Sequence, residues 1–131
     1  MSFRKLAVWI DHKEARIFHV LPDSFDKMTI EAPHRHVHRH PKGQEVDKNR
    51  DREHPDDAQH FFRDVSRALD DAGEVLILGP STAKLYLFGY IQRHEHALEP
   101  KVVGLETVDH PTDGQLVAYA KQYFKASDKM R

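Results

Sequence analysis

The sequence predicts an α/β fold in which a five-stranded mixed sheet, in the strand order 3-2-1-4-5, carries helices on both faces. Three short apolar runs open the chain, a long polar segment follows, and helices then alternate with strands. Right-handed crossovers place the fourth strand parallel to the first and the fifth beyond it. The result is a three-layer, ribonuclease H-like arrangement in a single domain spanning residues 1–131.

The first part of the chain contains three predicted strands, at residues 6–10, 15–21 and 28–32, each bounded by Asp, His, Pro or Ser. Polar turns at residues 11–14 and 22–24 separate them, so they are expected to form an antiparallel meander. In the second strand, apolar side chains occur at both alternating sets of positions, which predicts that neither face is fully solvated.

The strongest helical pattern follows the polar segment. Pro55 and two aspartates fit a first helical turn, and apolar residues then recur at helical spacing as far as Ala72. Residues 75–78 form a continuous apolar run, which is typical of a strand buried on both faces of a parallel sheet.

Two more helices and one more strand complete the predicted fold. A second helix has an apolar face that consists of Leu85, Phe88 and Ile91. Residues 101–108 form the fifth strand, and Thr112 with Gln115 predicts a capping box at the start of the last helix. We expect the chain from residue 125 onward to fray.

Charge and cysteine content limit the possible function classes. The chain has 20 Lys and Arg against 21 Asp and Glu, so it lacks the overall positive charge that attracts nucleic acid nonspecifically. The absence of cysteine excludes disulfides and thiolate metal sites and suits a reducing compartment, and the expected location is the cytoplasm. No apolar run is long enough to span a membrane and no signal peptide is recognisable, so we expect no membrane partner.

The polar segment at residues 33–54 has an unusual composition. It contains six Lys and Arg, four Asp and Glu, and five of the 11 histidines, with two valines as its only aliphatic residues. Such a segment cannot build a core, and a loop of this length is usually functional or disordered. Its net charge is +2 whereas the rest of the chain carries −3, so a basic, proton-sensitive loop belongs to a mildly acidic domain.

Two functional interpretations compete for this loop. As a cationic loop it would contact the phosphates of RNA; the candidate residues are Arg35, Arg39, Lys42, Lys48, Arg50 and Arg52. As an extended row of alternating imidazoles it would bind a divalent transition metal such as zinc; the candidate ligands are His34, His36, His38 and His40. Without a function, the same segment would be a solvated tract that binds metal adventitiously.

A second candidate site lies at the carboxyl edge of the parallel strands, where α/β sheets bind ligands. The polar residues that follow these strands are Asp11, His12, Ser81, Lys84, Asp109 and His110. The helix start at Ser81 would offer free amide groups to an anion, with Lys84 one turn inside. Turn and capping roles explain the same residues, and two aspartates are too few for a ribonuclease H-type metal nuclease.

Three stretches resemble a family of small bacterial proteins described as translational machinery proteins. They are residues 7–19, 73–84 and 109–120, which read AVWIDHKEARIFH, GEVLILGPSTAK and DHPTDGQLVAYA. The resemblance implies a fold of the translational machinery components type. That fold is shared with the middle domain of archaeal and eukaryotic peptide-chain release factors, with Pelota-type rescue factors and with some ribosomal proteins.

The more distant resemblance to release factors concerns the loop. Their middle domain carries a basic loop with a Gly-Gly-Gln motif ahead of a long helix. The corresponding loop here contains Lys42-Gly43-Gln44, so a lysine replaces the first glycine, and we do not expect peptidyl-tRNA hydrolysis. A chain of 131 residues also lacks room for the domains that flank the middle domain of a complete termination factor.

We therefore expect a non-catalytic, translation-associated protein that contacts RNA or the ribosome through the loop at residues 33–54. The alternative is a metal-binding protein or metal-dependent hydrolase that uses the histidine row. A third possibility is a homo-oligomer formed through a sheet edge or an exposed helix. The sequence offers no observation that ranks it against the other two.

Overall fold

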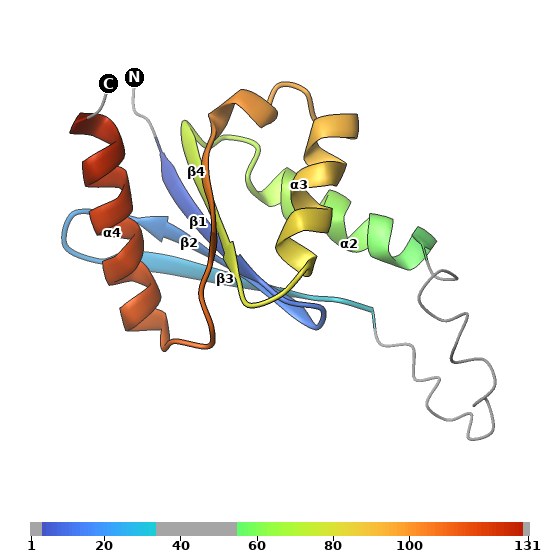
Figure 1. The fold of residues 1–131 in the computed structure, drawn as a ribbon, viewed down its shortest axis with the longest axis horizontal. Helices are drawn as coiled ribbons and strands as arrows, with labels where there is room; N and C mark the ends of the chain where they lie inside the picture. Colours follow the sequence, from blue (N-terminus) through green and yellow to red (C-terminus); the bar gives the residue numbers. More distant parts are fainter. Residues whose placement is uncertain (1–3, 34–54, 130–131) are drawn as a thin grey trace.

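Two parallel strands, β1 (Lys5–Ile10) and β4 (Glu74–Gly79), form the centre of the sheet in the computed structural model (Figure 1). The structure describes residues 4–33 and 55–129. Every residue of β4 is buried, which confirms that its continuous apolar run lies between two covered faces. The same holds for all of β1 after its first residue.

The remaining strands extend the sheet on both sides of this central pair. β2 (Glu14–Val20) pairs antiparallel with β1, β3 (Phe25–Glu31) pairs antiparallel with β2, and β5 (Val102–Thr107) pairs parallel with β4. The observed order, β3-β2-β1-β4-β5, confirms the prediction. β3 begins three residues before the predicted start because its pairing with β2 continues from Glu31 back to Phe25.

Helices cover both faces of the sheet, as predicted. α2 (Pro55–Ala68) and α3 (Ala83–His94) lie on one face and α4 (Asp113–Lys129) lies on the other (Figure 1). A short 3-10 turn, η3 (Glu99–Lys101), leads into β5. None of the helices in the described part of the chain is long and apolar enough to cross a membrane.

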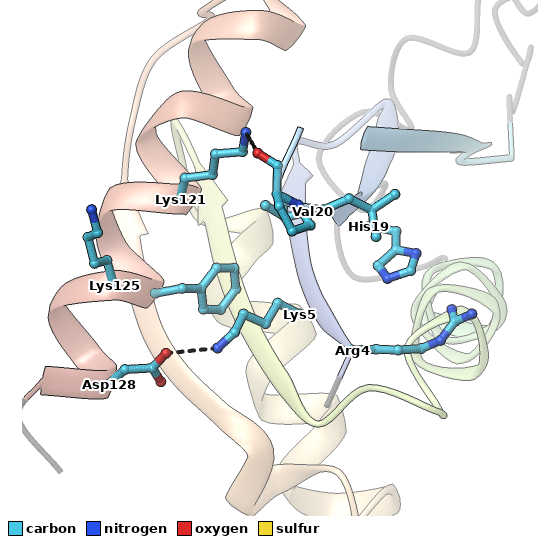
Figure 2. Close-up of a pocket in the computed structure, with 10 residues that line it drawn as sticks. Arg4, Lys5, His19, Val20, Lys121, Lys125 and Asp128 are labelled. Atoms are coloured by element: carbon cyan, nitrogen blue, oxygen red, sulfur yellow. Dashed lines mark hydrogen bonds and ion pairs between the residues drawn. The ribbon is translucent and has the colours of Figure 1, made fainter. Parts of the chain in front are cut away.

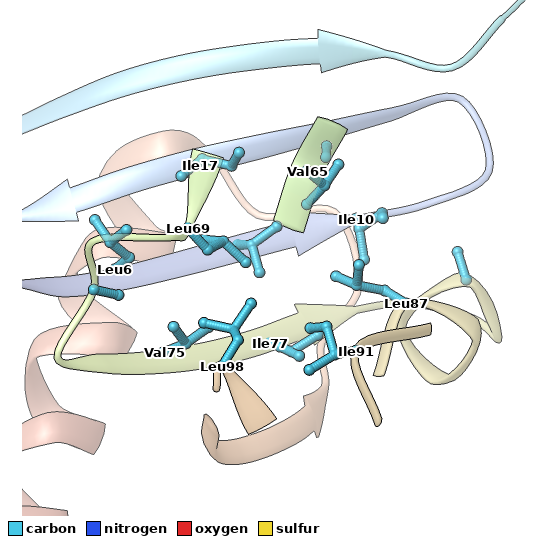
Figure 3. Packing of buried hydrophobic residues seen from close by; sticks show 14 of the residues in the cluster. Leu6, Ile10, Ile17, Val65, Leu69, Val75, Ile77, Leu87, Ile91 and Leu98 are labelled. Atoms are coloured by element: carbon cyan, nitrogen blue, oxygen red, sulfur yellow. The ribbon is translucent and has the colours of Figure 1, made fainter. Parts of the chain in front are cut away.

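Alternation along the central strands divides the core into two layers. The layer under α2 and α3 takes side chains from both central strands and is shown in Figure 3; the central-strand members are Leu6, Val8, Ile10, Val75 and Ile77. The layer under α4 takes the intervening residues, which are Ala7, Trp9, Leu76 and Leu78. Each central strand therefore contributes to both cores.

The inward face of α3 differs from the predicted one. Ile91 is fully buried and Phe88 packs against the core, but Leu85 is 49% exposed while Lys84 is only 6% exposed. The buried stripe passes through Ala83, Leu87 and Ile91 at intervals of four residues, and Leu85 lies well off that line. The prediction for Leu85 is therefore wrong.

The last helix is longer than predicted. α4 continues through Lys129, whereas the sequence suggested fraying from residue 125. Two contacts hold its final turns: Phe124 is 3% exposed, and the Asp128 carboxylate lies 3.0 Å from the ammonium of Lys5. Both contacts reach elements that are remote in sequence, so local composition does not indicate them.

The start of α4 confirms the predicted capping box. The Gln115 amide donates to Thr112 Oγ1 at 3.1 Å, and the Thr112 amide donates to Gln115 Oε1 at 3.0 Å. These reciprocal bonds satisfy two backbone donors that the helix leaves free.

Gly79 is required where β4 ends beside β1. A Cβ added to it would collide with the carbonyl oxygen of Ile10, a backbone atom that cannot move aside alone. We expect Gly79→Ala to lower the free energy of unfolding by about 3 kcal/mol, measured by urea denaturation. Gly114→Ala is the control, since no atom lies within 4 Å of its added Cβ; it should raise stability by up to about 1 kcal/mol. If the two substitutions change the free energy of unfolding equally, then the close approach of Gly79 to the Ile10 carbonyl does not exclude a side chain at position 79.

Candidate functional site

The carboxyl ends of β1, β4 and β5 lie at one edge of the sheet, because the three strands are parallel neighbours. The Val108 amide donates to the carbonyl oxygen of Gly79 at 3.0 Å and extends the pairing just beyond β5. The segments that follow the three strands therefore meet at this edge. They carry the six edge residues that the sequence singled out: Asp11, His12, Ser81, Lys84, Asp109 and His110.

Asp11 holds the turn between β1 and β2. Its Oδ1 accepts the amide N–H groups of Lys13 at 2.8 Å and Glu14 at 2.9 Å, and its own amide donates to the Glu14 carbonyl at 3.0 Å. This carboxylate oxygen is used by the backbone in the manner of an Asx turn. The described contacts of Asp11 are therefore those of a turn residue.

His12, Ser81 and Lys84 form one group, where the β1–β2 turn meets the start of α3. His12 Nε2 lies 3.4 Å from Thr82 Oγ1, and its ring meets the Tyr86 ring edge-on with centroids 6.4 Å apart. The Lys84 ammonium is buried and donates to the Ser81 carbonyl oxygen at 2.7 Å. Lys84 thus closes the turn that leads into α3.

Asp109 and His110 form a second group, built on Trp9 of β1. The indole N–H of Trp9 donates to the Asp109 carbonyl oxygen at 2.8 Å, and the His110 ring meets the indole edge-on at 5.2 Å. The Asp109 carboxylate lies 2.9 Å from His110 Nδ1, and both side chains are largely exposed. The Arg16 guanidinium packs over the Trp9 indole, 4.6 Å from the ring centroid, in a cation–π contact.

A hollow of about 470 Å³ adjoins this second group. The residues that line it are Val108, Asp109, His110, Pro111, Gln115, Leu116 and Tyr119. No hydrogen bond or ion pair between described residues joins the first group to the second. In residues 4–33 and 55–129, no group of three His, Asp or Glu side chains is placed to hold a metal ion.

The loop candidates lie outside the described residues. This applies to the phosphate-binding candidates Arg35, Arg39, Lys42, Lys48, Arg50 and Arg52, and to the metal-ligand candidates His34, His36, His38 and His40. The points where the chain leaves and re-enters the described part are Pro33 and Pro55. The Ala32 amide donates to the Lys13 carbonyl oxygen at 2.8 Å, so the chain leaves beside the β1–β2 turn, at the same edge as the six residues above.

A larger hollow, of about 620 Å³, lies at the opposite edge of the sheet, between α4 and the start of β1 (Figure 2). The sequence analysis did not single out its residues, which come from three separate segments. One signal was present: Lys121 and Lys125 are four residues apart and therefore share a face of α4. Recognising that this face looks onto the end of β2 required the tertiary structure.

No known protein-family profile matches this sequence, and no curated protein sequence matches it. Solved structures of translation factors and Pelota proteins are similar in fold. The Pelota protein of Thermoplasma acidophilum is 20% identical with a TM-score of 0.58, covering 86% of this chain and 30% of that one. Archaeoglobus fulgidus Pelota is 12% identical with a TM-score of 0.63, covering 96% and 32%.

The archaeal translation termination factor aRF1 is 15% identical with a TM-score of 0.53, covering 96% of this chain and 38% of that one. This chain therefore spans about a third of the length of the three structures. The class that these comparisons define is a domain with the Pelota and release factor fold. At these identities the similarity establishes the fold alone.

The contacts of Asp11 lead to a test of its role. Asp11→Ala removes the carboxylate oxygen that accepts hydrogen bonds from the Lys13 and Glu14 amides, and should lower the free energy of unfolding by about 2 kcal/mol. Asp11→Asn keeps the accepting oxygen and should cost less than about 1 kcal/mol. Asp109→Ala, at a side chain that is 91% exposed, should change stability by less than about 0.5 kcal/mol. The free energy of unfolding is measured by thermal or urea unfolding. If Asp11→Asn lowers it as much as Asp11→Ala does, then the negative charge of Asp11 stabilises the protein, rather than its hydrogen bonds in the turn.

Proposed function

We propose that this protein is a translation-associated binding protein that contacts RNA, in the ribosome or free, through the loop at residues 33–54. The shared fold is the observation that carries the proposal, since one similar structure is an archaeal translation termination factor. The three stretches that resemble the bacterial translational machinery family support the same assignment, and with it a cytoplasmic location.

Charge distribution supports the loop as the contact surface. The segment carries a net charge of +2 on a scaffold of −3, so attraction to phosphate has to be local. His12 and Lys13 are exposed in the β1–β2 turn, next to the point where the chain leaves β3. Lys13 therefore adds an exposed positive charge to the described surface beside this point.

The described edge residues favour binding over catalysis. The Asp11 carboxylate is used by two backbone amides, and the Lys84 ammonium by the Ser81 carbonyl. The exposed Asp109–His110 pair has no serine or threonine hydroxyl among its described hydrogen-bond partners. Asp11 and Lys84 position turns, and the proposed function assigns no reaction to any of these four residues.

Ribosome co-sedimentation and RNA binding at low salt test the proposal. We expect replacement of residues 34–52 by a Gly/Ser linker of equal length to abolish co-sedimentation. A variant with the six loop Lys and Arg residues changed to Gln should lose at least about 2 kcal/mol of RNA binding free energy at low salt, and its salt dependence should become shallower.

The matched control keeps the loop cations and changes the four alternating histidines to Gln. At pH 8 this control should bind RNA as the parent does, because neutral imidazoles add no charge. Unchanged co-sedimentation of the linker variant would overturn the proposal.

The alternative function is metal binding by the histidine row, and its motivation is the His-X-His-X-His-X-His spacing in the sequence. It predicts one equivalent of a divalent metal such as zinc in protein that is purified without nickel resin and measured by elemental analysis. His36→Ala with His38→Ala should then remove the metal. Metal content that stays unchanged in this double variant would exclude these two side chains as ligands.

A further inference from the structure

One edge of the sheet is open. β3 is the outermost strand beside β2, and no described strand pairs with its other side (Figure 3). Six of its seven residues are exposed, and it contains neither the proline nor the bulge that commonly protects an edge strand. Met28, in the middle of the strand, is 52% exposed. An edge of this kind can pair with another extended strand.

The opposite edge of the sheet is less accessible. The pairing of β5 with β4 contains a register shift, and the first five residues of β5 are partly buried. The Tyr123 hydroxyl of α4 donates to the Val103 carbonyl oxygen at 3.3 Å, so part of the β5 backbone is already used. β3 is therefore the edge that is better suited to a partner strand.

The hydrogen bonds between β2 and β3 show which backbone groups of β3 face the open edge. The Ala32 amide donates to the Lys13 carbonyl oxygen at one end of the ladder. The Leu21 amide donates to the Ser24 carbonyl oxygen at the other end. Bonded positions alternate in an antiparallel pair, so the even-numbered residues of β3 face β2. The residues whose N–H and C=O groups face outward are Phe25, Lys27, Thr29 and Glu31.

The side chains of β3 complement those of a second, antiparallel copy of the same strand. Placing Thr29 opposite Thr29 of the second copy also places Lys27 opposite Glu31. Met28 then lies opposite Ile30. The first of these pairs joins opposite charges on the α4 face of the sheet, and the second joins apolar side chains on the other face. The two-fold axis generates each pair twice.

Other registers that use the same outward groups match less well. Sliding one copy by two residues places Asp26 opposite Ile30, a charge against an apolar side chain. Sliding it by two more places Lys27 opposite Lys27 of the second copy, which repel each other. Charge complementarity therefore favours the register that has Thr29 on the two-fold axis.

The charged groups that this pairing needs are available. Glu31 is exposed and has no ion pair with a residue in the described part of the chain. The Lys27 ammonium lies 2.7 Å from Asp113, but Asp113 is also contacted by Arg16, at 3.3 Å. Asp113 therefore keeps a cation when Lys27 turns toward Glu31 of the second copy.

We propose that β3 is a self-association surface, through which two copies of this chain pair antiparallel about an axis at Thr29. The pairing joins the two five-stranded sheets into one and places both α4 helices on the same face. An interface made of one strand edge is small, so we expect a Kd of about 1–100 µM. The surface does not depend on the function proposed for the loop at residues 33–54.

Sedimentation of the full-length, nuclease-treated protein between about 1 µM and about 1 mM tests the proposal. We expect a concentration-dependent change from monomer to dimer. Lys27→Glu and Glu31→Lys should each weaken the dimer at least about tenfold, because each places like charges opposite one another. An equimolar mixture of the two variants should associate again, since every such pair then joins opposite charges.

Single cysteines report the register, because the chain has none of its own. Thr29→Cys should form a disulfide-linked dimer under mild oxidation, since the Cα atoms of a hydrogen-bonded pair lie about 5.5 Å apart. Met28→Cys should crosslink at least about tenfold more slowly, because the two positions 28 are diagonal neighbours, about 7–8 Å apart.

Two controls separate this surface from general electrostatics and from the loop. Arg93→Glu reverses an exposed charge on α3 and should leave the Kd of the dimer within about twofold. The variant with the Gly/Ser linker in place of residues 34–52 should dimerise as the parent does, whatever happens to its RNA binding.

Three outcomes would overturn the proposal. They are a protein that stays monomeric at about 1 mM, charge variants that associate as the parent does, and a mixture of the two charge variants that associates no better than either alone. Faster crosslinking of Met28→Cys than of Thr29→Cys would overturn the register.

Discussion

The parallel pairing of β1 with β4 is the constraint on which the rest of the structure depends. Both strands are buried on both faces, so their alternating side chains feed two separate cores at once. A slip of one residue in either strand would exchange the contents of the two layers, which hold differently sized side chains. The close approach of Gly79 to the Ile10 carbonyl fixes the end of this pairing, and the turns that carry the edge residues begin there.

The strand order and layers were predictable because they depend on local signals. A continuous apolar run, proline and glycine boundaries and right-handed crossovers were enough to place β4 beside β1. One error arose from a partner that is distant in sequence, and the other from a buried cation whose partner is a nearby backbone carbonyl. The length of α4 depends on Lys5, which pairs with Asp128 across 123 positions. The burial of Lys84 depends on a turn carbonyl that its own helix position brings within reach.

The candidate sites, too, were predictable in part and otherwise became visible only in the tertiary structure. Parallel topology was enough to predict that Asp11, Ser81 and Asp109 share one edge, since that follows from strand direction. It was not enough to predict that Trp9 and Arg16 anchor one half of this edge, because a ring, a guanidinium and a carbonyl from three segments had to meet. The hollow beside α4 carries no motif, because its lining comes from three separate segments that only the fold brings together.

The ion pair between Lys5 and Asp128 joins the first strand to the last helical turn, and Figure 1 shows the start of β1 and the end of α4 on the same side of the molecule. This geometry suits circular permutation, since a linker from the end of α4 to the start of β1 would not have to cross the sheet. New ends could then be opened in the segment that connects β3 to α2 in the chain. A permuted chain would keep both strands of the central pair and change only the covalent path between them.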